Sequence, residues 1–183
     1  MSLSVSCKMM GLGICIILAG CAQPAQESAM VPGSISPVPS SGKYHGSVSN
    51  VTGFGGGETN PIWTSEISKE DFQAALETSL RQAGIFSPSG RYTLRADILS
   101  VEQPLGGIDM KVAMIVRYNL IDGAGRVHFD ATIRSEYVAI FEEAFVGFER
   151  LRKANEGAAR ANILWLLKAL GSASSSGHIG AIS

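Results

Sequence analysis

Cysteine and histidine are scarce in this sequence of 183 residues. The three cysteines are Cys7, Cys15 and Cys21, so the sequence after Cys21 contains none. A folded body without cysteine has no disulfide to form and no thiolate metal site to build. The three histidines are spread from residue 45 to residue 178 and do not form the cluster that a transition-metal site needs. The sequence therefore predicts neither a metal ion nor a cofactor.

Neither sign of charge is in excess. Lys and Arg total 15 against 16 Asp and Glu. Removing the first twenty residues takes away Lys8 and no acid, which leaves 14 against 16, a net charge of −2. Such a chain has no broad positive potential to attract a phosphate backbone, so nucleic acid is excluded as a partner.

Motifs for catalysis are also missing. The chain has no Gly-x-Ser-x-Gly elbow, Walker loop or Glu-x-x-His arrangement. Gly55-Gly56-Gly57 lacks the context of a phosphate loop, and His128 is expected on the outward face of a strand. Asp130 and Glu136 lie six residues apart on one strand, so about 20 Å separates them. Paired glycosidase acids need about 5 to 9.5 Å. We expect no enzymatic activity.

No apolar run is long enough to cross a bilayer, which needs about 20 residues. The stretch from Met9 to Leu18 is uncharged, about 10 residues long, preceded by Lys8 and followed by small residues. This arrangement is typical of a cleaved signal peptide. We therefore expect residues 1–20 to be removed on export.

Leu18-Ala19-Gly20-Cys21 resembles the lipobox of bacterial lipoproteins. The resemblance implies cleavage between Gly20 and Cys21, diacylglycerol on the Cys21 thiol and an acyl chain such as palmitate on the new amino terminus. The alternative is an ordinary signal peptide followed by a chance cysteine. Several acyl chains, each contributing about 0.8 kcal/mol per buried CH₂, anchor a protein stably. Ala22 in place of an inner-membrane Asp signal implies the outer membrane, with the domain facing the periplasm.

Two segments have no periodic apolar face. Residues 22–43 hold four of the seven prolines, Pro24, Pro32, Pro37 and Pro39. This composition predicts an extended, disordered tether over residues 21–43. Residues 171–183 are rich in Gly and Ser and predict a loose tail. A domain is expected between them, over residues 44–170.

A helix is well specified near the start of this domain. Ser68 is a good N-cap, Glu70 and Asp71 lie in the first turn, and Ile67 and Phe72 occupy the positions of a hydrophobic staple. Gly84 supplies the expected end.

Four strands are expected around this helix. Residues 43–52 give a weak first strand, and Leu94, Ala96 and Ile98 alternate with charged residues. From residue 110 to residue 120 the alternation is clean, and Asp122-Gly123-Ala124-Gly125 predicts a hairpin turn. The following strand is expected to place Val127, Phe129, Ala131, Ile133 and Tyr137 inward and to place His128, Asp130, Thr132, Arg134 and Glu136 outward.

A long helix is predicted from Glu142 to Leu170. Its approximate apolar stripe includes Phe145 and Phe148, its charged residues are expected off that stripe, and Gly157 could mark a bend. The order β-α-β-β-β-α predicts an α+β fold, a mainly antiparallel four-stranded sheet with two helices on one face.

This order of elements resembles small outer-membrane lipoproteins: the lipopolysaccharide-assembly lipoprotein LptE, YajG-like lipoproteins, and auxiliary lipoproteins of lipid-transporting ABC systems. The resemblance covers about residues 44 to 170 and carries no residue-level signature. It implies a non-enzymatic role in the cell envelope, through binding of a partner protein or a lipid.

Two candidate contact regions are visible. Asn60, Pro61 and Trp63 form a rigid loop beside glycines, and Trp63 either anchors a partner or covers one end of the core. The basic run Arg150-Leu151-Arg152-Lys153 either contacts anionic lipid head groups or forms a solvated helix face.

The leading hypothesis is a lipid-anchored periplasmic module that binds or assembles an envelope protein. The alternative is a lipid carrier with an apolar pocket between the helices and the strand that holds Met110 and Met114, since methionine adapts to irregular apolar shapes. A third possibility is an enzyme with an unrecognised site.

Overall fold

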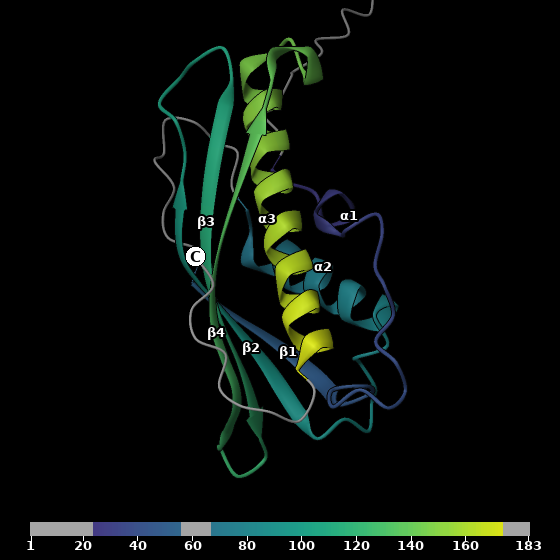
Figure 1. Cartoon of the computed structure of the whole chain (residues 1–183). Helices are drawn as coiled ribbons and strands as arrows, with labels where there is room; N and C mark the ends of the chain where they lie inside the picture. Colours follow the sequence, from purple (N-terminus) through teal and green to yellow (C-terminus); the bar gives the residue numbers. More distant parts are fainter. Residues whose placement is uncertain (1–23, 56–66, 174–183) are drawn as a thin grey trace, which may run out of the picture.

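The computed structural model describes residues 24–55 and 67–173. The elements follow one another along the chain as α1 (Glu27–Met30), β1 (Val48–Gly55), α2 (Lys69–Gln82), β2 (Tyr92–Glu102), β3 (Met110–Asp122), β4 (Val127–Ala139), the 3₁₀ turn η1 (Phe141–Glu143) and α3 (Gly147–Ser172). The four strands form one sheet in the order β1-β2-β3-β4 (Figure 1). The predicted α+β class and element order are confirmed.

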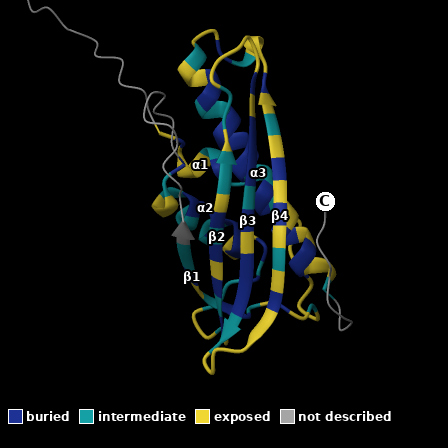
Figure 2. Ribbon diagram, turned by 90° about the vertical axis from the view of Figure 1, so that its left-hand side faces the viewer, coloured by how far each residue is buried: buried dark blue, intermediate teal, exposed yellow. Residues whose placement is uncertain are grey.

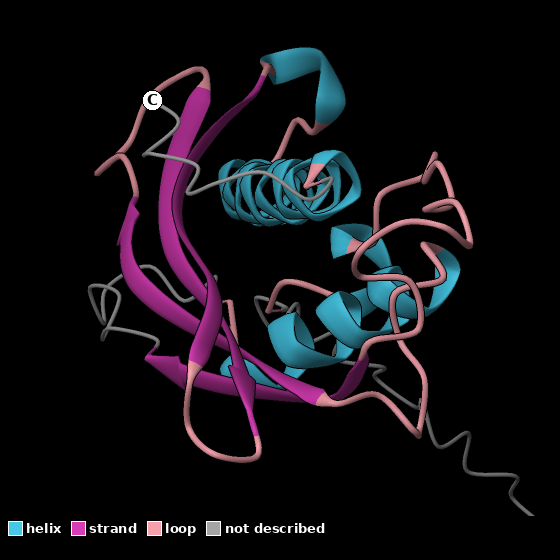
Figure 3. Cartoon of the chain, turned by 60° about the horizontal axis from the view of Figure 1, so that its bottom comes forward, coloured by secondary structure: helices cyan, strands magenta, loops and turns pink. Residues whose placement is uncertain are grey.

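The sheet is mixed because its first connection differs from the others. α2 carries the chain from the end of β1 back to the start of β2, so these two strands run parallel, whereas the shorter connections leave β3 antiparallel to β2 and to β4. The sheet curves around the helices, which lie on its concave side (Figure 3). One face is therefore buried and the other is open.

β3 shows the two faces clearly. Met110, Val112, Met114, Val116, Tyr118 and Leu120 are buried, while Lys111 and Arg117 are exposed. The predicted outward residues of β4 are confirmed, but Val127 is 55% exposed instead of inward. The register shifts between Leu120 and Ile121, so that Ile121 pairs with Val127 and the alternation slips at this bulge.

α2 begins and ends as the sequence predicts. The backbone N–H of Asp71 donates to Ser68 Oγ at 3.0 Å, which satisfies one free donor of the first turn. After the last turn Gly84 adopts a positive φ of 70°. This left-handed conformation is easy for glycine and closes the helix.

The last helix differs from its prediction at the N-terminal end. α3 begins at Gly147, later than the predicted start at Glu142, after the turn η1. Phe145 and Phe148, assigned to the apolar stripe, are 77% and 40% exposed, whereas Arg150 and Glu156, assigned to the solvated side, are buried. Phe145 therefore lies before the helix, and the buried Arg150 and Glu156 have polar partners in Ala144 O and the Gln26 N–H.

Gly157 permits a close approach of α3 to the sheet. A Cβ atom placed there would lie 2.3 Å from Cγ of Tyr137 on β4. α3 is assigned as one helix from Gly147 to Ser172. The glycine thus serves the contact with the Tyr137 ring, whereas the sequence suggested a bend.

A buried polar cluster joins α3 to the sheet. Asn162 is fully buried, its Oδ1 accepts the Tyr118 hydroxyl at 2.8 Å, and its Nδ2 donates to Ile133 O at 3.0 Å and to Ser135 Oγ at 2.9 Å. The Ser135 hydroxyl in turn donates to Ala158 O. Burial raises the pKa of Tyr118 well above its ordinary value, so its hydroxyl remains a donor at neutral pH.

The segment before β1 packs on the helices, in contrast to the predicted free tether. Ala25, Met30 and Val38 are buried, and Val38 N–H donates to Ala83 O at 2.9 Å. Composition predicted an extended chain because prolines interrupt any periodicity. These isolated apolar side chains fill gaps beside α2 and α3 without forming a periodic pattern.

The β3–β4 hairpin depends on Asp122. Its carboxylate accepts hydrogen bonds from the backbone N–H groups of Ala124 and Arg126 and pairs with His128 Nε2 at 2.8 Å. The hydrogen bond with His128, followed by that from the Arg126 backbone, holds the pKa of Asp122 well below its ordinary value. The ionised form is therefore the one that stabilises the turn.

Replacing this carboxylate should have a pH-dependent effect. A lowered carboxyl pKa contributes stability above the unfolded value of about 4, and that contribution is lost as the pH falls through the folded pKa. Asp122→Asn should lower Tm at pH 7, and this decrease should become progressively smaller as the pH falls from about 4 to about 2. Glu70→Gln on the exposed start of α2 should change Tm little at either end of this range. An equal loss for Asp122→Asn at pH 7 and near pH 2 would contradict the assignment.

Candidate functional site

Two connections meet at one end of the sheet. β2 ends where its antiparallel neighbour β3 begins, and β4 ends beside the same start, since Met110 pairs with Ala139. The β2–β3 connection, residues 103–109, therefore lies beside the segment 140–146 that leads into α3. Both lie at the upper end of the molecule in Figure 1.

This end exposes large apolar side chains. Leu105, Ile108 and Phe145 are 78%, 75% and 77% exposed. Seven residues form the group that we name the apolar tip: Leu105, Ile108, Ile140, Phe141, Phe145, Val146 and Phe148. They make up seven of the eleven large exposed apolar residues in the described ranges, so exposure is concentrated here rather than scattered. Contiguous apolar surface of this kind marks a contact with a protein or a membrane.

Polar contacts fix the two connections at their bases. Gln103, at the end of β2, donates from Nε2 to the buried Asn155 Oδ1 on α3 at 2.9 Å. Glu143 accepts the Tyr137 hydroxyl at 3.0 Å and the Ile140 N–H at 3.2 Å. Burial and the Glu143 carboxylate raise the pKa of Tyr137, so the hydroxyl stays a donor. The exposed side chains are thus held on an ordered frame.

Arg150 supports the tip from below. It is 5% exposed, its Nη1 donates to Ala144 O, and its guanidinium lies 5.2 Å from the centre of the Phe141 ring. Phe141 packs edge-to-face against Phe145 with 5.3 Å between ring centres. The buried cation is therefore used to position aromatic rings, whereas the sequence placed it among solvated or lipid-facing basic residues.

A pocket of about 220 Å³ lies beneath the tip, lined by Pro104, Leu105, Gly106, Gly107, Met110, Gly147, Phe148, Arg150 and Leu151. Ligand pockets commonly span roughly 300–1,000 Å³, so this one suits a single side chain better than a whole lipid. Met114, the second methionine of the expected lipid pocket, is fully buried in the core.

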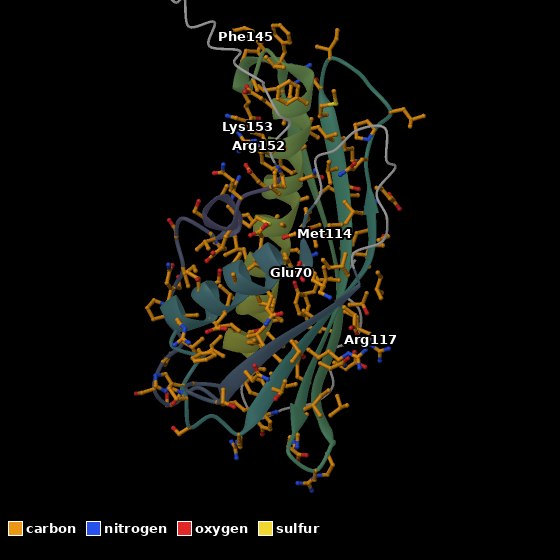
Figure 4. All side chains as sticks on the ribbon, turned by 180° about the vertical axis from the view of Figure 1, so that it is seen from behind. Glu70, Met114, Arg117, Phe145, Arg152 and Lys153 are labelled. Atoms are coloured by element: carbon orange, nitrogen blue, oxygen red, sulfur yellow. The ribbon has the colours of Figure 1, made fainter. Side chains whose placement is uncertain are left out.

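The remaining members of the basic run have separate surroundings. Arg152 Nη1 lies 3.2 Å from Glu156 Oε1, and Lys153 is partly buried. Near the tip, Lys111 pairs with Glu136 at 2.7 Å and Arg150 is buried, while Asp109, Glu142 and Glu149 are exposed acids. The run therefore belongs to a balanced region rather than to a strongly basic patch. Figure 4 shows Arg152 and Lys153 below Phe145, at the same end of the molecule.

The first described segment, which begins at residue 24, packs along the middle of α3. Ala29 O accepts from Arg160 at 2.7 Å, and Gln26 N–H donates to Glu156 Oε1 at 3.1 Å. From Ala29 back to Gln26, the segment therefore runs alongside α3 toward Gly147. The tip lies at that end of α3. Figure 1 shows α1 alongside α3.

The convex face of the sheet is the second broad surface, and among the described residues no helix packs on it (Figure 2). Its charges are paired: Arg117 with Asp130 at 2.7 Å, Lys111 with Glu136 at 2.7 Å, and Arg134 with Glu136. Lys111 and Arg134 lower the pKa of Glu136. Asp130 and Glu136 thus take part in two different ion pairs.

Several predicted site residues lie outside the described residues: the cleavage position Gly20–Cys21, the lipid-bearing Cys21, and the loop residues Asn60, Pro61 and Trp63. His128 is on the outward side of β4, where it pairs with Asp122. Within residues 24–55 and 67–173 there is no group of three acids, histidines or cysteines placed to hold a metal. No helix in the same ranges is long and apolar enough to cross a membrane.

The apolar tip was missed by sequence analysis. The helical spacing of Phe145 and Phe148 predicts a place on the apolar stripe, and the turn that contains Leu105 has no periodic pattern. The available signal was Leu105 and Ile108 on either side of Gly106-Gly107, since large apolar residues in a glycine turn have little opportunity to pack.

Comparison with known proteins supports the fold. No family model and no curated protein matches the sequence. The structure is similar to that of protein XCC0632 from Xanthomonas campestris, of the DUF330 family, with a TM-score of 0.54 and 12% identity over 73% of this chain and 88% of that one.

Two further similarities are weaker. A candidate lipoprotein from Caulobacter crescentus has a TM-score of 0.49 and 13% identity over 80% of this chain and 92% of that one. A minor lipoprotein from Acinetobacter baumannii has a TM-score of 0.48 and 8% identity over 70% of this chain and 94% of that one. At such identities the likeness to the Xanthomonas protein establishes a shared fold and nothing finer.

Proposed function

We propose that the protein is a lipoprotein anchored through acylated Cys21 at the periplasmic face of the outer membrane. In this proposal it is not an enzyme. It is an accessory module of the cell envelope that binds a partner protein on the open face of its sheet.

The observation that carries this proposal is the packing of the first described residues on α3. Gln26, which contacts Glu156, follows closely after Cys21 in the sequence. An acylated Cys21 would therefore hold the domain near the membrane in a restricted orientation, whereas a long free tether would not. A restricted orientation is useful to a module that presents one surface to another envelope protein.

The extent and the paired charges of the open face support its choice as the partner-binding surface. It extends along β2, β3 and β4, and its ion pairs place charges of both signs at defined positions. Complementary charges on a partner would select orientation and association rate more than affinity. The carrier alternative has weaker support, since the pocket at Met110 is small and Met114 lies in packed core.

The anchor can be tested by metabolic labelling with palmitate in the bacterium. The wild-type chain should incorporate label and fractionate with the outer membrane. Cys21→Ser should lose the label and keep its signal peptide. Persistent labelling of Cys21→Ser, or release of the wild-type chain as an unmodified periplasmic protein, would contradict the proposal.

The partner surface can be tested by photocrosslinking in intact cells, with the photoreactive residue placed at Arg117 on β3 or, as a control, at Glu70 on α2. These positions lie on different surfaces in Figure 4. We expect a discrete protein adduct from position 117, weaker adduct formation when Cys21 is also replaced by Ser, and none from position 70. If no adduct forms from position 117, the proposed open-face interface is wrong.

A further inference from the structure

The geometry points to a phospholipid bilayer as the occupant of the apolar tip: we propose that the tip inserts into the leaflet that holds the acyl chains of Cys21. This inference rests on the proposed lipid anchor and adds a second, non-covalent membrane contact made by the folded domain.

The composition of the tip fits shallow insertion. Its seven residues are Leu, Val, two Ile and three Phe, and Leu105, Ile108 and Phe145 are the most exposed of them. Leaving such side chains in water is unfavourable, and their removal from water favours insertion. The connections stand at the end of the sheet, beyond the strands, so they can enter a surface without disturbing the core.

The hydrogen bonds that hold the base of the tip also favour insertion into a bilayer. Arg150, Gln103 and Glu143 hold the two connections through hydrogen bonds to carbonyl, amide and N–H groups. An ordered frame keeps the apolar side chains pointing away from the domain, so insertion does not require them to rearrange. A flexible apolar loop would instead lose conformational entropy on binding.

The path of the chain favours the bilayer over a soluble partner. Glu156, the contact of Gln26, lies eight residues along α3 from Phe148, a rise of about 12 Å. Five residues separate Gln26 from Cys21, and an extended chain spans up to about 3.6 Å per residue, or about 18 Å. The chain is also directed toward the tip between Ala29 and Gln26. Acyl chains on Cys21 and the side chains of the tip can thus reach one leaflet together.

The charges around the tip indicate which lipid composition the tip would bind. The bases around the tip are not in excess, since Lys111 pairs with Glu136, Arg152 pairs with Glu156 and Arg150 is buried. A surface without excess positive charge gains little from anionic lipid, which attracts polybasic segments. Insertion should therefore depend on apolar contact and proceed equally on neutral and anionic bilayers.

The experiment uses the acylated mature protein in vesicles. Because residues 22–183 contain no cysteine and Cys21 is acylated, Phe145→Cys provides one free thiol for a spin label. The matched control is Arg117→Cys on the open face of the sheet. Accessibility of each label to oxygen and to a water-soluble nickel complex gives its depth, in vesicles of phosphatidylcholine alone and of phosphatidylethanolamine with phosphatidylglycerol.

The expected result is a label at position 145 about 5–10 Å below the head groups in both lipid mixtures, as for interfacial apolar segments. The label at position 117 should remain in water. Adding Leu105→Asp and Ile108→Asp should move the label at position 145 back into water while the acylated chain stays on the vesicles.

Other outcomes separate the two proposals. A vesicle-bound protein whose label at position 145 stays in water overturns tip insertion and leaves the anchor intact. Purified wild-type protein that carries no acyl chain and does not bind vesicles overturns the anchor. A photoreactive residue at position 145 that forms a discrete protein adduct in cells would assign the tip to a protein partner instead.

Discussion

Replacing Gly157 with Ala should lower the free energy of unfolding by about 2–3 kcal/mol, a Tm decrease of roughly 10 °C, although alanine is the better helix former. The added Cβ would lie 2.3 Å from Cγ and 2.4 Å from Cδ1 of Tyr137. The obstruction is the base of an aromatic ring, which cannot swing aside as the end of a flexible side chain could. Relief would require α3 and β4 to move apart, and these elements pack closely against each other.

Thermal and denaturant unfolding of the variant would measure this loss. Gly171→Ala in the same helix is the matched control, since its new Cβ meets Val38 Cγ2 at an ordinary 3.6 Å and should cost nothing. In a Tyr137→Ala background the ring is gone, so Gly157→Ala should cost little or stabilise the helix by up to about 1 kcal/mol. An equal loss in both backgrounds would show that the Tyr137 contact is not the cause.

Replacing Asn162 with Leu should destabilise the protein by about 2–4 kcal/mol, since buried groups would lose their partners. The Tyr118 hydroxyl would lose its acceptor at 2.8 Å, and Ile133 O would lose a donor at 3.0 Å. The substitution is similar in size, so lost hydrogen bonding would dominate over cavity formation.

A double-mutant cycle with Tyr118→Phe tests this explanation through the midpoint of denaturant unfolding. Tyr118→Phe removes the hydroxyl that Asn162→Leu leaves unsatisfied, so the double variant should lose less stability than the sum of the two single variants. Strict additivity would indicate that the two side chains do not share one network. Thr132→Val on the open face of β4 provides a control with little expected effect.

The parts of the fold that sequence predicted are those with regular periodicity. The alternation from Met110 to Leu120 requires one buried face, and Ser68 with Gly84 marks both ends of α2 by local hydrogen bonding and backbone conformation. These signals act over a few residues and do not depend on what the element packs against.

The parts that sequence did not predict depend on distant contacts. The burial of Glu156 follows from its partners Gln26 and Arg152, and Gln26 lies 130 residues earlier in the chain. Phe145 and Phe148 have the spacing of a core stripe, but α3 starts at Gly147, where the end of the sheet leaves them uncovered. Periodicity shows that residues share a face without showing what covers it.

For the candidate site, the resemblance of Leu18-Ala19-Gly20-Cys21 to a lipobox predicts a cellular location from four consecutive residues, whereas the apolar tip is assembled from two connections that are far apart in the sequence. The antiparallel order of β2, β3 and β4 places them together. A single sequence could identify Leu105 and Ile108 as unusual in a glycine turn, but it could not show that Phe145 lies beside them.

The docking of the first segment on α3 also sets an order of events during biogenesis. Gln26 and Ala29 contact residues 130 and 131 positions later in the chain. A polypeptide emerges from the ribosome, or from an export channel, with its N-terminus first. Gln26 and Ala29 therefore cannot make these contacts until almost the whole of the described chain has emerged, and Met30 lacks its buried environment during that interval. Completion of α3 is thus the step that allows the first described segment to dock on the domain.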